Sequence, residues 1–221
     1  MKMMTCFVKF WMVGLVVGSL IISSTGCGKK EEGKKGVSEK EVAVKAEKIV
    51  LSKEVEQILE KKMGLIKKLA ADSLIIKATR ESNQKNKDTT LSEILRLDNK
   101  WKKAEGMDEF IKSFITNECA QYLMDFQEAN EGFPEVFIAD EKGLIVAETN
   151  RTSDYYQADE DWWINTYDKG RGKSYHGEIE YDESARAEAI ALYVPVMDPE
   201  TKRAIGVIKV ICDITAIKME L

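Results

Sequence analysis

The sequence has very little of what hydrolases and disulfide-rich secreted proteins rely on. Its 221 residues include one histidine, three prolines and four cysteines. A nucleophilic serine or cysteine needs a neighbouring base, and His176 is the one histidine that could supply it. Neither a G-x-S-x-G motif nor an H-E-x-x-H motif occurs. These absences argue against the common hydrolase classes, and we expect a protein that is not an enzyme.

The chain also lacks an excess of positive charge. It carries 33 lysines and arginines against 38 aspartates and glutamates, which gives a net charge of -5. Domains that bind nucleic acid carry clustered positive charge, so we expect no nucleic-acid partner. Gly172-Lys173-Ser174 matches only the end of a phosphate-binding P-loop, because Tyr167 stands where that pattern needs a glycine. We expect no cofactor.

Acidic residues, in contrast, are dense between residues 154 and 183. Two of them could form the acid and base of a glycosidase, or several could hold calcium loosely. The run from Asp159 to Asp161 is better explained by a helix N-terminus, which favours negative charge. Glu178 and Glu180 alternate with apolar residues, as on the solvated face of a strand. We therefore expect no metal site.

The first 26 residues have the order of a bacterial secretory signal. Lys2 and Lys9 precede an apolar run from Phe10 to Ile22, and small residues then lead into Cys27. Ser24-Thr25-Gly26-Cys27 resembles a lipobox, in which a peptidase cuts before the cysteine and a lipid is attached to its thiol. A spanning helix needs about 20 apolar residues, so an uncleaved anchor is the weaker alternative. We expect a cell-envelope protein outside the cytoplasm, held to a membrane by the lipid on Cys27.

The rest of the chain divides into a tether and one folded domain. Residues 27–37 are rich in glycine and charge and are predicted to be a lipidated, solvated tether. Residues 38–134 form a helical lead and residues 135–221 a sheet-forming part of the same domain. Cys119 falls in a helical pattern and Cys212 in a strand pattern. Two buried free thiols are expected there, with a disulfide between them as the alternative.

A long helix is predicted at the start of the folded part. Apolar residues recur at helical spacing from Ser38 to Lys77 without a proline, and Ser38 with Glu41 forms a capping box. A small domain cannot cover so long a helix. Its first half is therefore expected to pair with a second copy or a membrane sensor partner, or else to stay solvated.

Two more helices should follow before the sheet. The polar residues 81–90 break the first helical pattern. Thr90 then caps a helix that runs to Ala104, and Gly106 ends it. Asp108 opens a third helix, which is predicted to continue to Gly132.

After Pro134 the spacing of apolar residues changes to the period of a β-strand. A turn at residues 140–143, in which Gly143 can take a positive φ, joins the first two strands. A short helix capped by Asp159 is predicted over Glu160–Tyr167. The fold class is α+β, with a long N-terminal helix and helical lead packed on a five-stranded antiparallel sheet. The expected strands are residues 135–139, 144–149, 174–181, 187–197 and 204–213.

Aromatic rings and acids are interleaved in the stretch Asp154–Trp163. Rings desolvate a ligand while polar atoms orient it, so this stretch is a candidate pocket, and a plain aromatic core patch is the alternative. In the last predicted strand Lys209 and Asp213 share one face with apolar residues, whereas small residues such as Gly206 lie on the other. The small face can receive a helix. The mixed face fits a polar-ligand pocket, unless both charges are solvated near the strand ends.

Several strings resemble the single Cache domain, a PAS-like extracytoplasmic sensor module of bacterial chemoreceptors and histidine kinases. The helical segment Leu97-Asp98-x-x-Trp101-x-x-Ala104 is similar to the segment before the sheet in this group. The resemblance covers about residues 38–214. The strings are E-V-F-I-A-D-E-K-G-L-I-V-A-E-T (135–149), T-S-D-Y-Y-Q-A-D-E-D-W-W (152–163), G-x-G (170–172), I-E-Y-D-E-S (179–184), V-P-V-M-D (194–198) and I-G-V-I-K-V-I-C-D-I (205–214).

The resemblance implies a long helix on one sheet face and a ligand cavity on the other, roofed by the insertion between the second and third strands. The amino-acid-binding branch carries an arginine in the roof that pairs with the ligand carboxylate, and Glu160 stands at that position here. If Glu160 faces the cavity, a cationic or hydroxyl-bearing ligand fits better than an amino acid. The implied ligand-binding residues are Tyr155, Tyr156, Trp162 and Trp163 in the roof, Tyr181, Asp182 and Ser184 beside it, and Tyr193 and Asp213 at the floor or rim.

The expected function is therefore that of a membrane-anchored extracytoplasmic sensor domain of the Cache type, which binds a small-molecule ligand. The sequence ends at Leu221, shortly after the last predicted strand, so an output module of its own is not expected. The alternative is a structural or scaffolding lipoprotein whose Cache fold binds nothing and whose helix over residues 38–77 mediates association.

Overall fold

The computed structural model describes residues 51–182 and 187–221, and of Tyr181, Asp182 and Ala187 it describes the backbone alone. The predictions for residues 1–50 therefore lie outside the described residues. They include the secretory signal, the lipidation of Cys27, the tether and the capping box at Ser38. Ser184 also lies outside them.

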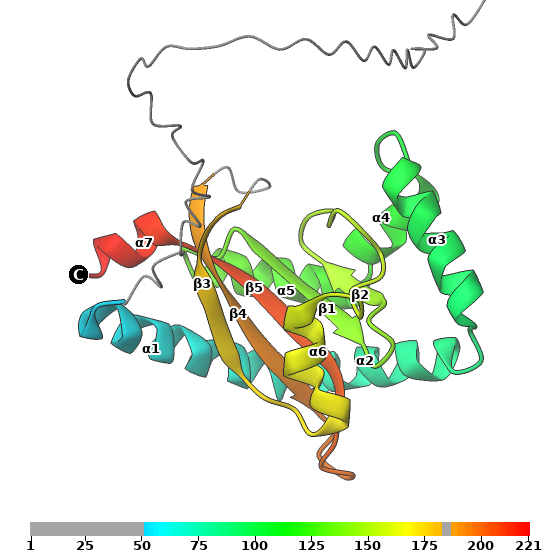
Figure 1. The fold of residues 1–221 in the computed structure, drawn as a ribbon, viewed down its shortest axis with the longest axis horizontal. Coiled ribbons are helices and arrows are strands. Elements are labelled where there is room, and N and C mark those ends of the chain that lie inside the picture. Colours follow the sequence, from blue (N-terminus) through cyan, green and yellow to red (C-terminus); the bar gives the residue numbers. More distant parts are fainter. Residues whose placement is uncertain (1–50, 183–186) are drawn as a thin grey trace, which may run out of the picture. The chain divides into compact units, whose positions relative to one another are not determined.

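The described chain is built around one five-stranded antiparallel sheet, so the predicted α+β fold is confirmed (Figure 1). The strand order is β2-β1-β5-β4-β3. The alternation of apolar residues had indicated each strand to within a residue or two. The strands are β1 (Glu135–Asp140), β2 (Ile145–Glu148), β3 (Tyr175–Asp182), β4 (Ala187–Met197) and β5 (Ala204–Asp213).

Local chemistry fixes the first hairpin. Gly143 has a φ of 77°, as the predicted turn requires. The Asp140 carboxylate accepts hydrogen bonds from the amides of Lys142 (2.9 Å) and Leu144 (3.0 Å), which closes the turn. The same carboxylate accepts hydrogen bonds from the Ser82 hydroxyl and the Asn86 amide of a neighbouring helix. The turn is therefore attached to the helical layer as well as to the sheet.

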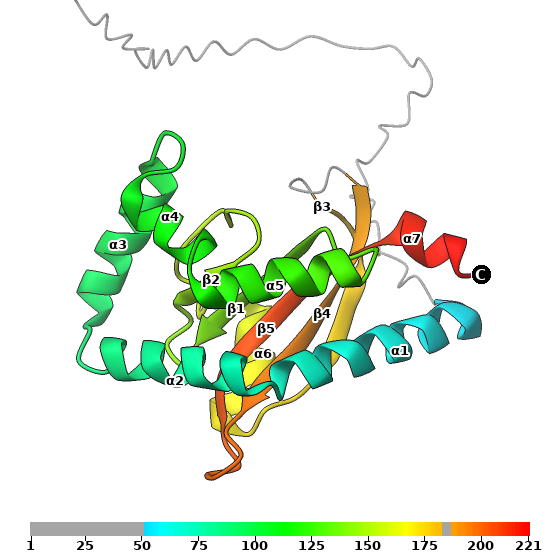
Figure 2. The ribbon, with the colours of Figure 1, turned by 180° about the vertical axis from the view of Figure 1, so that it is seen from behind.

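Three helices cover one face of the sheet: α1 (Lys53–Ala70), α2 (Ser73–Asn86) and α5 (Glu118–Ala129). Figure 2 shows them lying across the strands. Buried residues of the strands, such as Ile138 and Ile208, meet buried residues of the helices, such as Ile66. At Gly206 an added Cβ would lie 2.5 Å from the Ala139 oxygen and 2.7 Å from a methyl carbon of Thr79. The small face of β5 therefore receives a helix, as predicted.

The predicted single helix over residues 38–77 is wrong in its described part. It breaks at Ala71 and Asp72, because the Asp72 side chain accepts a hydrogen bond from the Leu74 amide (2.8 Å) and begins a new helix. The new helix α2 also continues through the polar residues 81–86, which had been expected to end it. Polar side chains there bind the sheet layer: for example, Asn83 donates to the Ile205 oxygen at 2.8 Å.

The third predicted helix is also two helices, α4 (Glu109–Ile115) and α5. Asp108 caps α4 as expected. Asn117 starts α5: its side chain accepts a hydrogen bond from the Ala120 amide (2.8 Å) and donates to the Val146 oxygen of β2 (3.0 Å). This contact with the sheet fixes a break that the helical pattern does not show.

The remaining helical predictions have mixed outcomes. The helix α3 (Leu91–Lys103) is capped by Thr90, as predicted. A further short helix, α7 (Ile214–Met219), was not predicted, and Asp213 caps it through the Thr215 amide (2.7 Å). Cys119 and Cys212 are buried free thiols, as expected. Among the described residues no helix is long and apolar enough to cross a membrane.

Candidate functional site

The stretch between β2 and β3 forms a roof over the sheet face opposite to the three covering helices (Figure 1). We call residues 152–167 the roof. The roof ends in the helix α6 (Asp161–Tyr167), which contacts β4 and β5. The predicted cap Asp159 is wrong: Glu160 occupies the N-cap position and makes no side-chain capping bond there. Its carboxylate is therefore not used by the helix.

One row of opposed side chains crosses the roofed face of the sheet. Strand pairing places each member opposite the next, so all of them lie on the same face. From β2 to β3 the row is Glu148, Phe137, Lys209, Tyr193 and Tyr175.

Trp162 of α6 closes the middle of this row. Its ring stacks on Tyr193 with centroids 5.4 Å apart and meets Phe137 edge-on at 5.8 Å. The Lys209 ammonium lies 5.0 Å from the centroid of Trp162 and 5.7 Å from that of Phe137. Aromatic faces attract a cation, so this arrangement holds the lysine against the underside of the roof.

A small cavity of about 80 Å³ lies on the same face, next to Tyr193 and Lys209 of the row. Its floor consists of Ala189 and Ala191 on β4 with Ile211 on β5. Ala189 and Ala191 are much smaller than Tyr193, which lies on the same face of β4. The small side chains leave the space that forms the cavity beside the stacked rings. The remaining lining residues are Gly177, Glu178, Glu180, Tyr193 and Lys209.

A bulge in β3 directs an acid toward this cavity. The register of β3 against β4 shifts between His176 and Ile179, so one residue is extra on β3. As a result Ile179 joins the helix-covered core and Glu180 lies opposite Ala189 on the roofed face. The solvated strand face predicted for Glu178 and Glu180 is therefore the mouth of the cavity, where both side chains are exposed.

The electrostatics of the roofed face differ from those of an ordinary core. Burial raises the pKa of the Tyr193 hydroxyl well above its usual value, and Tyr175, Glu180 and Glu160 raise this pKa further. Glu160 is therefore near enough to Tyr193 to affect the ionisation of its hydroxyl.

Two polar atoms on this side are buried without a hydrogen-bond partner among the described residues. One is the indole nitrogen of Trp163 and the other is Oε1 of Glu148. Oε2 of Glu148 accepts a hydrogen bond from the Thr152 amide (3.0 Å). Burial nevertheless raises the pKa of the Glu148 carboxyl to about 7. The carboxyl is thus held at the point where the roof leaves the sheet.

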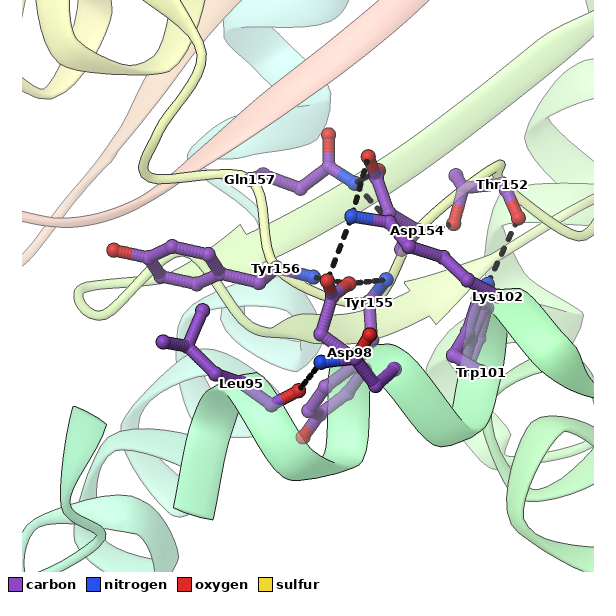
Figure 3. Close-up of polar contacts among 10 residues, drawn as sticks. Leu95, Asp98, Trp101, Lys102, Thr152, Asp154, Tyr155, Tyr156 and Gln157 are labelled. Atoms are coloured by element: carbon purple, nitrogen blue, oxygen red, sulfur yellow. Dashed lines mark hydrogen bonds and ion pairs between the residues drawn. The ribbon is translucent and has the colours of Figure 1, made fainter. Parts of the chain in front are cut away.

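The roof is fixed from above by α3 (Figure 3). The Asp98 carboxylate accepts hydrogen bonds from the amides of Tyr155 (3.0 Å) and Tyr156 (3.2 Å), and it pairs with Lys102 at 2.7 Å. The indole of Trp101 donates to the Thr152 oxygen at 2.9 Å. This contact set accounts for the Leu97-Asp98-x-x-Trp101 string: its aspartate and tryptophan anchor the roof.

Of the predicted ligand-binding residues, Trp162 and Tyr193 are brought together beside the cavity. Trp163 stacks on Tyr167 at 4.6 Å behind them. The Tyr155 ring points away, into a cluster with three aromatic rings of α3 and α4, Trp101, Phe110 and Phe114. Asp213 lies on the roofed face but its carboxylate caps α7.

The other predicted residues are less defined. Tyr156 is partly buried and forms an isolated bridge with Leu144. The backbones of Tyr181 and Asp182 pair with β4, whereas their side chains and Ser184 lie outside the description. A role in ligand binding stays a prediction for every residue of the set.

Sequence reasoning missed Phe137 and Glu180 as members of this site. Lys209 had been singled out by strand alternation, and the same alternation places Phe137 opposite it once the strand order is known. Glu180 could not be found in this way, because the bulge reverses its face. Asp98 was visible only as part of a string, without a role.

Comparisons with known proteins find similarity at the level of fold. No family model matches the chain, and no curated protein matches it. Among solved structures, the sensor domain of the V. cholerae histidine kinase DctB is similar at 13% identity, over 75% of this chain and 54% of that chain, with a TM-score of 0.42. The ligand-binding domain of the Pseudomonas aeruginosa chemoreceptor PctB, in complex with L-Arg, matches at 11% identity, with coverages of 76% and 54% and a TM-score of 0.40.

A third neighbour is the ligand-binding domain of the Campylobacter jejuni chemoreceptor Tlp3 in complex with 4-methylisoleucine, at 13% identity, 76% and 64% coverage and a TM-score of 0.38. The chain thus spans between 54% and 64% of the length of these three domains. All three are sensor or ligand-binding domains, the class that the sequence resembles. At such low identities and TM-scores, these likenesses assign neither a ligand nor a partner to this chain.

Proposed function

We propose that the protein is a small-molecule sensor domain held outside the cytoplasm by a lipid on Cys27, and that it passes its ligand state to a membrane partner. One observation carries the binding claim: a cavity with an alanine floor adjoins an aromatic roof and contains a lysine, Lys209. Small apolar residues form the floor, and charged and polar side chains form most of the remaining lining, which suits a small polar ligand. The resemblance of the sequence to Cache domains supports the same class.

The contacts of the roof supply a route by which ligand binding could be transmitted. Next to α6 the Gln157 amide donates to the Gly143 oxygen at 2.7 Å. Gly143 belongs to the turn whose Asp140 carboxylate accepts hydrogen bonds from Ser82 (2.9 Å) and Asn86 (2.8 Å) of α2. A roof that closes on a ligand therefore moves a turn that is bonded to the helical layer. A ligand shifts the equilibrium between an open and a closed roof only if it binds the closed state more tightly.

The described part of α1 helps to locate the partner surface. Its exposed positions are all polar: Lys53, Glu54, Gln57, Glu60, Lys61, Lys67 and Lys68. A helix face of this kind is well solvated and offers little apolar area for pairing. If the protein pairs with a second copy or a membrane partner through its first helix, we place the contact N-terminal to this stretch.

A thermal-shift screen tests the binding claim. The full chain, in detergent, is screened against amines, organic acids and amino acids, together with the variants Ala191→Leu and Ala129→Leu. Ala191 is part of the cavity floor, whereas Ala129 is exposed at the end of α5. A ligand of this site should raise the Tm of the wild type and of Ala129→Leu but not of Ala191→Leu. A ligand that stabilises all three proteins equally binds elsewhere and contradicts the proposal.

A scaffolding lipoprotein is the second candidate, and one observation favours it. Trp162 itself fills the space between Phe137 and Tyr193, which leaves a cavity of only about 80 Å³. A domain plugged by its own tryptophan needs no ligand. If no compound of the screen raises the Tm and the protein is a stable dimer through residues 38–77, the scaffolding role is the better account.

A further inference from the structure

We propose that the cavity takes a small zwitterion, whose carboxylate binds Lys209 and whose ammonium group lies toward Glu180 at the mouth. This inference rests on the proposed function, because it names the ligand class of the same cavity. It follows from the charges that line the cavity, their depth and the space between them.

The lysine is the first part of the argument. Lys209 is half-buried in the cavity, and its ammonium lies over the rings of Trp162 and Phe137. No described carboxylate forms an ion pair with it. Aromatic faces attract the charge but do not replace the hydrogen-bond acceptors that an ammonium group with three donors requires. A ligand carboxylate would supply both the acceptors and the opposite charge.

The mouth carries the opposite charge. Glu178 and Glu180 line it from β3. A simple anion that binds Lys209 would lie close to these carboxylates and be repelled by them. A simple cation would be attracted by the mouth but repelled by Lys209. A molecule with both charges, its anion inward and its cation outward, meets each group with the opposite sign.

The volume limits the size of the ligand. The cavity measures about 80 Å³, far below the several hundred Å³ of sites for drug-sized ligands, so it admits only a very small molecule. Glycine, β-alanine and γ-aminobutyrate are among the smallest zwitterions and differ in the separation of their charges. The volume above the floor residues Ala189 and Ala191 leaves no room for a large apolar side chain. The site is therefore suited to a short chain with a charge at each end.

The orientation differs from that expected of the amino-acid-binding branch that the sequence resembles. Here the sheet contributes both charges, the cation Lys209 from β5 and the acid Glu180 from β3. Lys209 and Glu180 are unequally buried, so their mutations should weaken ligand binding by different amounts. Lys209 is half-buried on aromatic rings, whereas Glu180 is exposed. Loss of the lysine should therefore weaken binding more than loss of the glutamate, because an exposed charge is screened by water.

The experiment compares matched probes on the full chain by isothermal titration. The probes are glycine, β-alanine and γ-aminobutyrate, with propionate and propylamine as single-charge analogues of β-alanine. At least one zwitterion should bind. The single-charge analogue of a zwitterion that binds should be weaker by about tenfold or more, the loss expected for one charge-assisted hydrogen bond.

Three variants identify the contacts. Lys209→Met should weaken the zwitterion by about tenfold or more without weakening propylamine. Glu180→Gln should weaken the zwitterion several-fold without weakening propionate. Lys68→Met, at an exposed lysine of α1, serves as the control and should change nothing. A cooperative melt for each variant shows that it is folded.

Two results overturn the inference, and they differ from a failure of the proposed function. If a single-charge compound or another class binds in a manner abolished by Ala191→Leu while no zwitterion does, the ligand class is wrong and the sensor function stands. If a zwitterion binds but Lys209→Met has no effect, the orientation is wrong. If no compound of any class binds in the cavity, the proposed function itself fails.

Discussion

The two faces of the sheet use the same strands and are packed in opposite ways. On the helix-covered face, residues such as Ile138 and Ile208 are fully buried, and Gly206 lets α2 approach the backbone. On the roofed face the neighbouring positions carry Phe137, Lys209 and Ala191, with an open cavity beside a stacked tryptophan. Close packing on one side provides stability, and the other side leaves the space and charge that the proposed ligand site requires.

Truncation of one isoleucine on each face should show the largest contrast. Ile66 is fully buried against the helix-covered face, and Ile211 is 4% exposed at the cavity floor. Ile66→Ala should lower the free energy of unfolding by about 2–5 kcal/mol. Ile211→Ala should cost roughly half as much, because part of this side chain borders empty space and loses fewer contacts.

Urea denaturation of both variants measures the difference. Equal losses of stability would mean that the cavity is closed in solution and that the two faces are packed alike.

Removal of the roof anchor should also be costly, although it truncates no apolar side chain. Asp98→Ala leaves the buried amides of Tyr155 and Tyr156 without their acceptor and should lower the free energy of unfolding by about 2–4 kcal/mol. Asp98→Asn keeps an acceptor oxygen and should cost less. Hydrogen exchange should also be faster at residues 154–157 in the alanine variant. Unchanged exchange there would show that the roof is held by its aromatic rings alone.

The roofed face should make stability depend on pH. The pKa of the Glu148 carboxyl is raised to about 7, so the folded state keeps a proton that the unfolded state, with a carboxyl pKa of about 4.3, has lost. The contribution of the protonated Glu148 carboxyl to the free energy of unfolding is therefore fully present below the unfolded pKa and is lost as the pH rises toward 7. The free energy of unfolding should fall by on the order of 2–3 kcal/mol across that window.

Glu148→Gln is the matched variant, because it cannot titrate and keeps an acceptor for the Thr152 amide. Urea denaturation between pH 4.5 and 7.5 should show a smaller decline for this variant than for the wild type. Parallel profiles would assign the pH dependence to other groups.

The smallest expected effect comes from replacing one alanine with leucine on each face of the sheet. Ala147 is fully buried on the helix-covered face, opposite Ile138, whereas Ala191 forms part of the cavity floor. Ala147→Leu should cost about 1–3 kcal/mol through overpacking, and Ala191→Leu should cost less than about 1 kcal/mol, since it fills existing space. If Ala191→Leu proves the more damaging of the two, the space at the floor is too small for a side chain, and for a ligand of the proposed size.

The sequence was most informative for features that depend on local interactions along the chain. Successive side chains of β4 and β5 point to opposite faces of the sheet. The two-residue period of their side-chain types therefore located both strands. The turn before Gly143 and the cap at Thr90 follow from local backbone chemistry. The faces of β5 could also be assigned in advance, with Lys209 on the side of the roof.

Breaks that depend on distant contacts could not be predicted. Asp72 and Asn117 resemble ordinary polar residues within helices. Their role as caps is reinforced by the hydroxyl of Tyr122, which donates to Asp72, and by the Val146 oxygen of β2. The bulge in β3 is equally hidden, and it alone decides that Glu180 rather than Ile179 faces the cavity. The position of the roof over the face that carries Lys209 could therefore be predicted, whereas the acidic mouth of the cavity could not.

The most direct test of the account is to map where a ligand binds. The full chain in detergent is labelled for NMR and titrated with the compound that raises its Tm most. The largest chemical-shift changes should fall on the amides of Gly177, Ala189 and Ala191 and on the indole of Trp162, all on the roofed face. Changes confined to the helix-covered face, or none with any compound, would contradict the claim that the roofed face is the ligand-binding side of the sheet.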